Sequence, residues 1–243
     1  MTVEYIIVLA VIAVLSVVQS LFGMGVLVFG TPTLLLMGYD FITTLSYLLP
    51  ASFAISLLQV QAAGENRVPI SKYLYLLCLP GIGIGLWFAD APVLASWTNT
   101  LIGGVLLFSA LIRLWKPARL LLLTLLEKYL PIYHLMIGLT HGLTNLGGGL
   151  LAILASGLNS DKDLIRNTIA HYYLAFSIIQ MITLVAVLGY LDILIAHSPT
   201  GIVSAAVYLL IGNRLFFRTS NPTYNMSLTL FMAIYGIVIL LEN

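Results

Sequence analysis

Three consecutive glycines, Gly147 to Gly149, lie within an apolar stretch and directly follow Thr144 and Asn145. Glycine costs a helix interior about 1 kcal/mol relative to alanine, so the triplet predicts that a membrane helix is interrupted here. A short helix that starts after the interruption would point the positive end of its dipole and several free N–H groups inward. Such a helix start binds anions without a buried lysine or arginine, so the stretch favours anion binding. Thr144 and Asn145 could add side-chain donors beside those amides, or serve only as helix caps.

A weaker copy of the glycine pattern stands near the start of the chain, at Gly23 and Gly25, and Pro32 follows it. We expect the two interruptions to face each other and to form an ion path. The alternative is that the glycines only permit close helix packing, as small residues do in membrane helices. Gly138 and Gly142 suit that packing role well.

Two serine–glutamine pairs recur in the sequence, Ser56 with Gln59 and Ser177 with Gln180. Residues three apart share one helical face, so each pair could direct a hydroxyl and an amide at one ligand. Polar side chains in membrane helices are costly and tend to face an interior. Hydrogen bonds between helices would account for these residues equally well.

Candidate proton carriers accompany the two interruptions. His141 lies six residues before Gly147, and Gln19 lies six residues before Gly25. A histidine titrates near neutral pH and could couple anion transport to protons, and His171 could serve instead. For both histidines the alternative is a neutral, hydrogen-bonded structural role.

Catalytic chemistry has little support in the sequence. The apolar stretches contain no nucleophile beside a base, no paired carboxylates and no His-x-x-x-His spacing. Cys78 is the single cysteine, which excludes an intramolecular disulfide and a cysteine metal cage. We therefore expect no enzyme activity, no cofactor and no metal site.

The composition places the chain in a membrane. Of its 243 residues, 60% are hydrophobic and 8% are charged, and the mean hydropathy is +1.07. These values lie far outside the range of soluble domains. A formal charge of +1, with lysines and arginines scattered over connecting loops, indicates no nucleic-acid partner. The expected partners are the lipid bilayer and a small anion, and assembly into a homo-oligomer is left open.

Eight apolar stretches approach or exceed the length of about 20 residues that crosses a bilayer. The first and the fifth are too long for one span, and both contain the glycine interruptions. The stretches are residues 5–38, 41–63, 70–89, 96–113, 131–159, 164–190, 198–214 and 223–241.

The ten lysines and arginines occur in four loops, and such residues concentrate on the cytoplasmic side of a membrane. All ten fall on one side if the fifth stretch folds back as a hairpin, whereas they divide six to four if every stretch crosses once. The distribution therefore favours a hairpin, and the length of the first stretch favours a second one. This topology predicts a multi-pass protein of the inner membrane with both termini on the extracytoplasmic side.

The chain reads as a duplication. Residues 53–59 match residues 174–180 at an offset of 121, and Gly25 matches Gly147 at an offset of 122. Each half then holds a broken hairpin followed by three spans, an odd number of crossings that inverts the second half relative to the first. Inverted repeats of this kind place a substrate site near the midplane, at broken helices.

The predicted fold class is an all-α polytopic membrane protein built from two inverted repeats. The first transmembrane repeat covers residues 1–113 and the second covers residues 131–243. Residues 114–130 form a cytoplasmic linker, which we expect to contain an interfacial helix.

Two glycine motifs, G-x-G followed by Pro32 and the later G-G-G triplet, carry a family resemblance over nearly the whole sequence. They resemble the motifs of the TauE/SafE sulfite exporter family, also called TSUP. The usual first motif of that family is G-x-G-G-G, whereas this chain has Val26 and Leu27 in place of the last two glycines. The second copy has Asn145 in place of the first glycine and Leu154 in place of the proline.

The resemblance implies transport of an anion with a sulfur oxyanion head, such as sulfite, thiosulfate or an organosulfonate. We expect a secondary transporter that works by alternating access, with proton coupling left open. The alternative is an anion channel that uses the two glycine interruptions as a filter. The expected substrate-binding residues are Gly23, Gly25, Ser56, Gln59, Thr144, Asn145, Gly147, Gly148, Gly149, Ser177 and Gln180. The candidate proton carriers are His141, His171 and Gln19.

Overall fold

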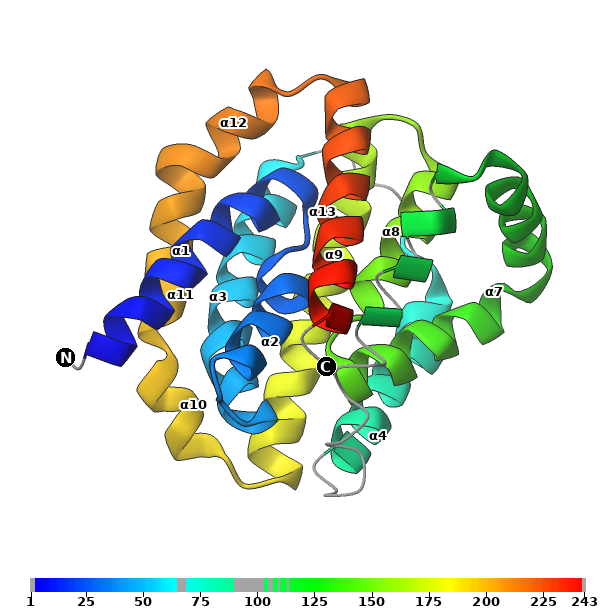
Figure 1. The fold of residues 1–243 in the computed structure, drawn as a ribbon. Coiled ribbons are helices and arrows are strands. Elements are labelled where there is room, and N and C mark those ends of the chain that lie inside the picture. The colour runs from blue at the N-terminus through cyan, green and yellow to red at the C-terminus, as the bar shows by residue number, and fades with distance from the viewer. Residues whose placement is uncertain are drawn as a thin grey trace.

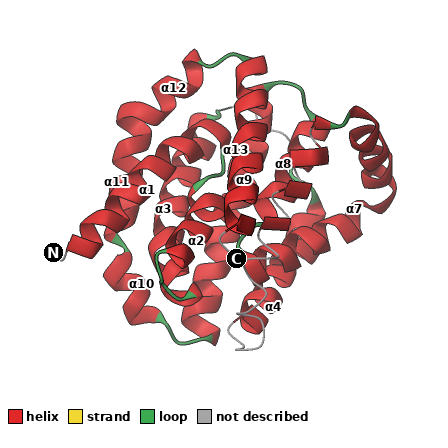
Figure 2. Cartoon of the chain, viewed as in Figure 1, coloured by secondary structure: helices red, strands yellow, loops and turns green. Residues whose placement is uncertain are grey.

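The computed structural model describes residues 3–64, 69–89, 103–104, 107–108, 110–112 and 114–241. This part of the chain is built from helices joined by short turns and contains no strand (Figure 2). The helices are α1 (Val3–Phe22), α2 (Val26–Leu36), α3 (Phe41–Ala62), η1 (Leu74–Cys78), α4 (Leu79–Ala89), α7 (Lys116–Thr144), α8 (Gly147–Leu158), α9 (Lys162–Ile182), η2 (Thr183–Val187), α10 (Leu191–His197), α11 (Pro199–Val207), η3 (Tyr208–Gly212), α12 (Asn213–Arg218) and α13 (Asn221–Leu241). The η elements are π-helical turns that continue the helices beside them.

Four continuous helical segments are long and apolar enough to cross a membrane, namely Val3–Phe22, Phe41–Ala62, Lys162–Val187 and Leu191–Arg218. Shorter apolar helices accompany them, among them α2 and α8. The prediction of an all-α, multi-pass membrane protein is therefore confirmed. The predicted stretch at 96–113 lies largely outside the described residues.

The helices of the two halves of the chain are interleaved in one bundle (Figure 1). Helix α3 of the first half packs against α9 and α11 of the second half. Helices α10 to α12 flank the side on which α1 lies, and α4 and α7 form the opposite side. The short helices α2 and α8 lie inside, where residues 147–156 are all buried.

Both long apolar stretches are interrupted at the glycine motifs, as the sequence predicts. Helix α1 ends at Phe22 and α2 begins at Val26, while α7 ends at Thr144 and α8 begins at Gly147. Gly23 and Asn145 both adopt left-handed backbone angles, with φ of 77° and 63°. Asparagine tolerates this conformation better than other side chains do, which explains how it replaces a glycine in the second motif.

The start of the second helix after each break, α3 or α9, is also equivalent in the two halves. Asp40 precedes α3, and its carboxylate accepts a hydrogen bond from Thr43 N–H at 2.8 Å. Asp161 stands 121 positions later, precedes α9 and accepts from Asp163 N–H at 2.7 Å. The described elements thus follow the same order in both halves, whereas the inversion of one half relative to the other stays a prediction.

A ladder of glycines lets α4 and α7 pack backbone against backbone. A Cβ atom at Gly85 would lie 2.8 Å from the Leu139 carbonyl oxygen, and one at Gly142 would overlap the Ile82 carbonyl oxygen. Gly138 lies in the same way against Cys78. The packing interpretation of Gly138 and Gly142 is therefore confirmed.

Two predicted connections are helical instead. The connection expected between the stretches 164–190 and 198–214 is occupied by α10. It leads into α11, whose first turn holds Pro199, where the missing N–H costs nothing. The linker expected at 114–130 contains the predicted helix, but that helix belongs to α7 and is separated from the rest by a kink at Tyr129. Pro131 removes a helical hydrogen bond just after this kink.

Candidate functional site

The two breaks lie against each other in the interior of the bundle. The Asn145 side-chain amide, in the second break, donates to the Thr31 hydroxyl of α2 at 2.7 Å, and both residues are fully buried. A Cβ atom at Gly148 would lie 2.5 Å from a methyl group of Val28, so the start of α8 touches α2 directly. The helix starts that follow the two breaks are therefore in contact, as expected if the breaks face each other, whereas the ion path between them stays a prediction.

The first break is closed by one side chain, that of Gln19. Its Oε1 accepts a hydrogen bond from Val26 N–H, at the start of α2, at 3.1 Å. Its Nε2 lies 3.1 Å from the Ser52 hydroxyl, the Ser52 carbonyl and the Ser56 hydroxyl, all of which can accept. The Gln59 side-chain amide donates to the backbone carbonyls of Gln19 and Ser20, at 3.0 and 3.2 Å. The carboxamide of Gln19 therefore occupies the place where an anion was expected.

The second break contains a chain of hydrogen bonds that ends on His141. The Thr31 hydroxyl donates to the Leu27 carbonyl at 2.7 Å, so towards Asn145 it can only accept. Asn145 therefore presents its NH₂ group to Thr31 and its Oδ1 to the Gln180 Nε2, at 3.2 Å. Gln180 Oε1 lies 3.2 Å from His141 Nε2. Because that oxygen only accepts, His141 carries its proton on Nε2 and leaves Nδ1 with a lone pair.

Three buried polar atoms around the second break have no hydrogen-bond partner. They are the hydroxyl oxygens of Tyr173 and Ser177 and the Nδ1 atom of His141. The Tyr173 hydroxyl lies against Gly148, where any Cβ atom would overlap it. The His141 ring lies 5.8 Å from the Tyr173 ring, between centroids, and Gly147 fits closely over the His141 Cβ. Tyr173 and His141 therefore lie at the start of α8, whereas Ser177 stands one helical turn after Tyr173 on α9, and leaving such buried atoms unpaired costs free energy.

Tyr173 was missed by the sequence analysis. Its position in an aromatic, apolar helix resembles ordinary core packing, and only the repeat offset indicates otherwise. Tyr173 stands 121 positions after Ser52, which contacts Gln19 in the first break.

Other predicted residues do not join the cluster. The Thr144 hydroxyl donates to the Thr140 carbonyl at 2.7 Å and lies 3.3 Å from Leu146 N–H, which is a capping role. His171 uses its Nδ1 on the Asn167 carbonyl of its own helix at 3.0 Å and is only half-buried. It has no described contact with the break.

A comparison with protein families identifies the family of this chain. The family model of the sulfite exporter TauE/SafE matches residues 8–239, and thus both glycine breaks and nearly the whole chain. The chain belongs to the TauE/SafE sulfite exporter family. Neither the comparison with curated proteins nor the comparison with solved structures found a match. The family resemblance predicted from the glycine motifs is therefore confirmed.

In this TauE/SafE chain, a cation that the sequence analysis places in a loop is buried within a helix. Arg166 lies within α9, is only 7% exposed and holds its guanidinium carbon 3.3 Å from the centroid of the Phe216 ring. It also donates to the Ser20 carbonyl at 3.4 Å. The carbonyl oxygen of Arg166 lies 2.8 Å from where a Cβ atom of Gly23 would stand. Cation–π stacking thus holds a buried arginine beside the first break.

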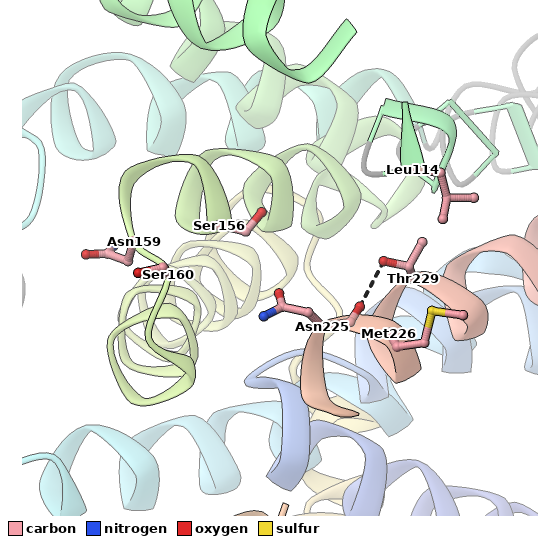
Figure 3. Close-up of a pocket in the computed structure, with 7 residues that line it drawn as sticks. All are labelled: Leu114, Ser156, Asn159, Ser160, Asn225, Met226 and Thr229. Atoms are coloured by element: carbon pink, nitrogen blue, oxygen red, sulfur yellow. Dashed lines mark hydrogen bonds between the residues drawn. The ribbon is translucent and has the colours of Figure 1, made fainter. Parts of the chain in front are cut away.

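The TauE/SafE chain also has a polar pocket of about 320 Å³ at the other end of α8 (Figure 3). Ser156 lies roughly 12 Å along the helix from Gly148, at 1.5 Å per residue. None of the residues predicted for the site lines this pocket. The lining residues are Leu114, Ser156, Asn159, Ser160, Asn225, Met226 and Thr229.

Proposed function

We propose that the protein is a secondary transporter that moves a small sulfur oxyanion through the two apposed breaks by alternating access. Membership of the TauE/SafE family supports the class of substrate. The membrane setting requires that the substrate's charge be stabilised by internal groups, because burying an isolated ion in hydrocarbon is very costly. The starts of α2 and α8 offer such groups, and the one buried arginine described beside the first break, Arg166, is stacked on Phe216.

The observation that carries the proposal is the contact between the two breaks. Asn145 bonds to Thr31 across the halves, and Gly148 lies against Val28. Two helix starts that meet in the interior give a charged guest one shared place between the two sides of the membrane. Transporters with broken helices hold their substrates at such places.

The closed state of this region favours a transporter over a channel. Asn145, His141 and Gln180 are all fully buried, and their side chains bond to one another. An anion reaches them only after the surrounding helices move apart, which is the step that alternating access supplies. A channel would instead pass anions down their gradient at high rates, so saturable counterflow in proteoliposomes distinguishes the two.

Gly148→Val tests the proposal. The new side chain would overlap the Tyr173 hydroxyl and Val28, so it fills the start of α8. We expect sulfite uptake by proteoliposomes to be lost, while the purified protein keeps its elution volume and helix content. Gly148→Ala is the milder form if the valine variant fails to fold.

Gly83→Ala is the matched control, since a Cβ atom at Gly83 meets only the Thr183 hydroxyl at 3.6 Å. This variant should transport sulfite normally. Normal uptake by a folded Gly148→Val variant would contradict the proposal and leave close packing as the role of the glycines.

A further inference from the structure

The two breaks use equivalent positions in different ways. Four pairs of positions correspond at offsets of 121 or 122, namely Gln19 with His141, Ser52 with Tyr173, Ser56 with Ser177, and Val26 with Gly148. In the first half, the members of these pairs bond to one another through Gln19. In the second half, the counterparts of the two serines, and Nδ1 of the histidine that replaces Gln19, have no partner.

We propose that the anion binds at the second break alone, and that it binds together with one proton, so that the preferred substrate is hydrogensulfite. This inference rests on the proposed function and specifies its site. The Tyr173 and Ser177 hydroxyls donate to the oxyanion, and His141 Nδ1 accepts from its protonated oxygen. The start of α8 adds backbone N–H groups, foremost that of Gly148.

Gln19 indicates the kind of group that the second break would bind. Its Oε1 accepts from Val26 N–H while its NH₂ group reaches two serine hydroxyls. An oxyanion at the second break would put one oxygen at the equivalent N–H, that of Gly148. In the first break, the Gln19 side chain of the protein itself makes these hydrogen bonds. In the second break, we infer that the bound anion makes the equivalent ones.

The choice of acceptor and donor atoms sets the protonation state of the guest. Tyr173 and Ser177 each have a hydrogen to donate, but His141 has committed its proton to Gln180 and can only accept at Nδ1. A fully deprotonated anion would face that lone pair with an oxygen lone pair, which is repulsive. A single proton between Nδ1 and the anion removes the conflict, whichever atom carries it.

The charges around His141 point the same way. Tyr173 on α9 is a titratable residue whose ring contacts the His141 ring. The neighbouring helices α2 and α8 contain no titratable side chain. Cys78 of η1 lies against Gly138, one turn before His141 on α7. Arg166, also on α9, is turned to Phe216. Because none of the charged side chains that the structure describes faces the site, a monoanion is far cheaper to bury there than a dianion.

The requirement for a proton separates the candidate substrates. Sulfite exchanges its last proton near neutral pH, so hydrogensulfite is abundant there. Thiosulfate and organosulfonates are fully deprotonated under the same conditions. They fit the hydroxyl donors but not the acceptor at Nδ1.

Calorimetry on the purified full-length protein tests the site and the proton together. Sulfite, thiosulfate and methanesulfonate, which has no hydrogen-bond donor, are titrated at pH 6 and pH 8, in buffers of different ionisation enthalpy, so that bound protons are counted. We expect sulfite to bind most tightly, with net uptake of one proton at pH 8, where free sulfite is mainly the dianion. Equal binding of thiosulfate and sulfite without proton uptake would overturn the protonated form.

Tyr173→Phe and the matched Ser52→Ala variant separate a binding role from a structural one. Removing the Tyr173 hydroxyl should weaken sulfite binding about ten- to hundredfold, as expected for a hydrogen bond to a charged group. It should leave the melting temperature of the ligand-free protein unchanged or raised, because the hydroxyl has no partner there. Ser52→Ala should keep wild-type sulfite affinity.

Wild-type sulfite affinity in Tyr173→Phe would overturn the assignment of the second break. The proposed function fails separately, if the wild-type protein in proteoliposomes moves no sulfur oxyanion at all. Sulfite transport that is intact in both the wild type and Tyr173→Phe leaves the transporter in place and removes only this site.

Discussion

The first and second breaks have similar backbone conformations and differ in the side chains that line them. Gly23 and Asn145 turn the chain in the same left-handed way, and Gly25 and Gly147 each lie against the residue six positions earlier. That residue is Gln19 in one break, where it satisfies the start of α2, and His141 in the other. The comparison teaches that two breaks with equivalent backbone turns can differ in whether the buried polar groups around them are paired.

The largest expected effect comes from making the second break like the first, with His141→Gln. The new carboxamide should reach Gly148 N–H and the two unpartnered hydroxyls, as Gln19 reaches their counterparts. We expect sulfite affinity to fall by at least about a hundredfold, because a side chain now occupies the site. Calorimetry measures the affinity, and thermal unfolding should show a protein at least as stable as the wild type.

His134→Gln is the control for that variant. His134 is a second buried histidine of α7, but it bonds to the Tyr172 hydroxyl at 2.8 Å, outside the cluster. Its replacement should leave sulfite affinity near the wild-type value. Tight sulfite binding by His141→Gln would break the comparison, since a sealed second break could not hold an anion.

A smaller effect is expected from Asn145→Gly, which gives the second break the turn residue of the first. The left-handed backbone is retained, but the link from Thr31 to Gln180 is lost, and with it the proton position of His141. We expect a loss of about 1–3 kcal/mol in unfolding free energy and a weaker dependence of sulfite binding on pH. Denaturation and titration at two pH values measure these changes.

Asn145→Ala should lower the unfolding free energy by roughly 1–2 kcal/mol more than Asn145→Gly does, because the left-handed backbone conformation is unfavourable for alanine. Equal stability of the alanine and glycine variants would show that the left-handed backbone conformation of Asn145 does not limit the stability of the protein.

The smallest effect concerns the caps, where the two halves are alike. Asp40→Ala and Asp161→Ala should each cost about 1 kcal/mol of unfolding free energy, with sulfite affinity unchanged. Burial opposes the charge of Asp40, but hydrogen bonds from Thr43 and nearby backbone N–H groups prevail and lower its pKa. Its stabilisation is therefore present at neutral pH and fades as the pH falls below about 4. Urea unfolding at pH 7 and pH 3 checks the loss, and a large change in sulfite affinity in either variant would contradict the assigned role.

The sequence predicts the breaks well because glycine destabilises a helix through its backbone alone, whatever packs around it. Three glycines in an apolar run, and a weaker copy at the repeat offset, indicate interrupted helices without any knowledge of packing. The membrane class follows from composition in the same way. Even the replacement of a motif glycine by Asn145 is understandable from the few side chains that tolerate a left-handed turn.

The contents of the breaks could not be predicted from residue types alone. Gln19 and His141 both look like candidate ligands, and only their hydrogen bonds show that one is satisfied and the other is not. Tyr173 has the apolar neighbours of a packing residue, and Arg166 stands too close to a loop for burial to be expected. Such assignments depend on contacts between α1, α3, α7 and α9, which lie far apart in the chain.

The most direct test of the account is to locate the anion. Selenite, the selenium analogue of sulfite, scatters anomalously, so a crystal of the protein grown with it would reveal its position. The account predicts one selenium peak at the start of α8, within hydrogen-bond distance of Tyr173, Ser177 and His141. A peak at the start of α2 beside Gln19, or in the polar pocket at the far end of α8, with none near Gly148, would contradict it.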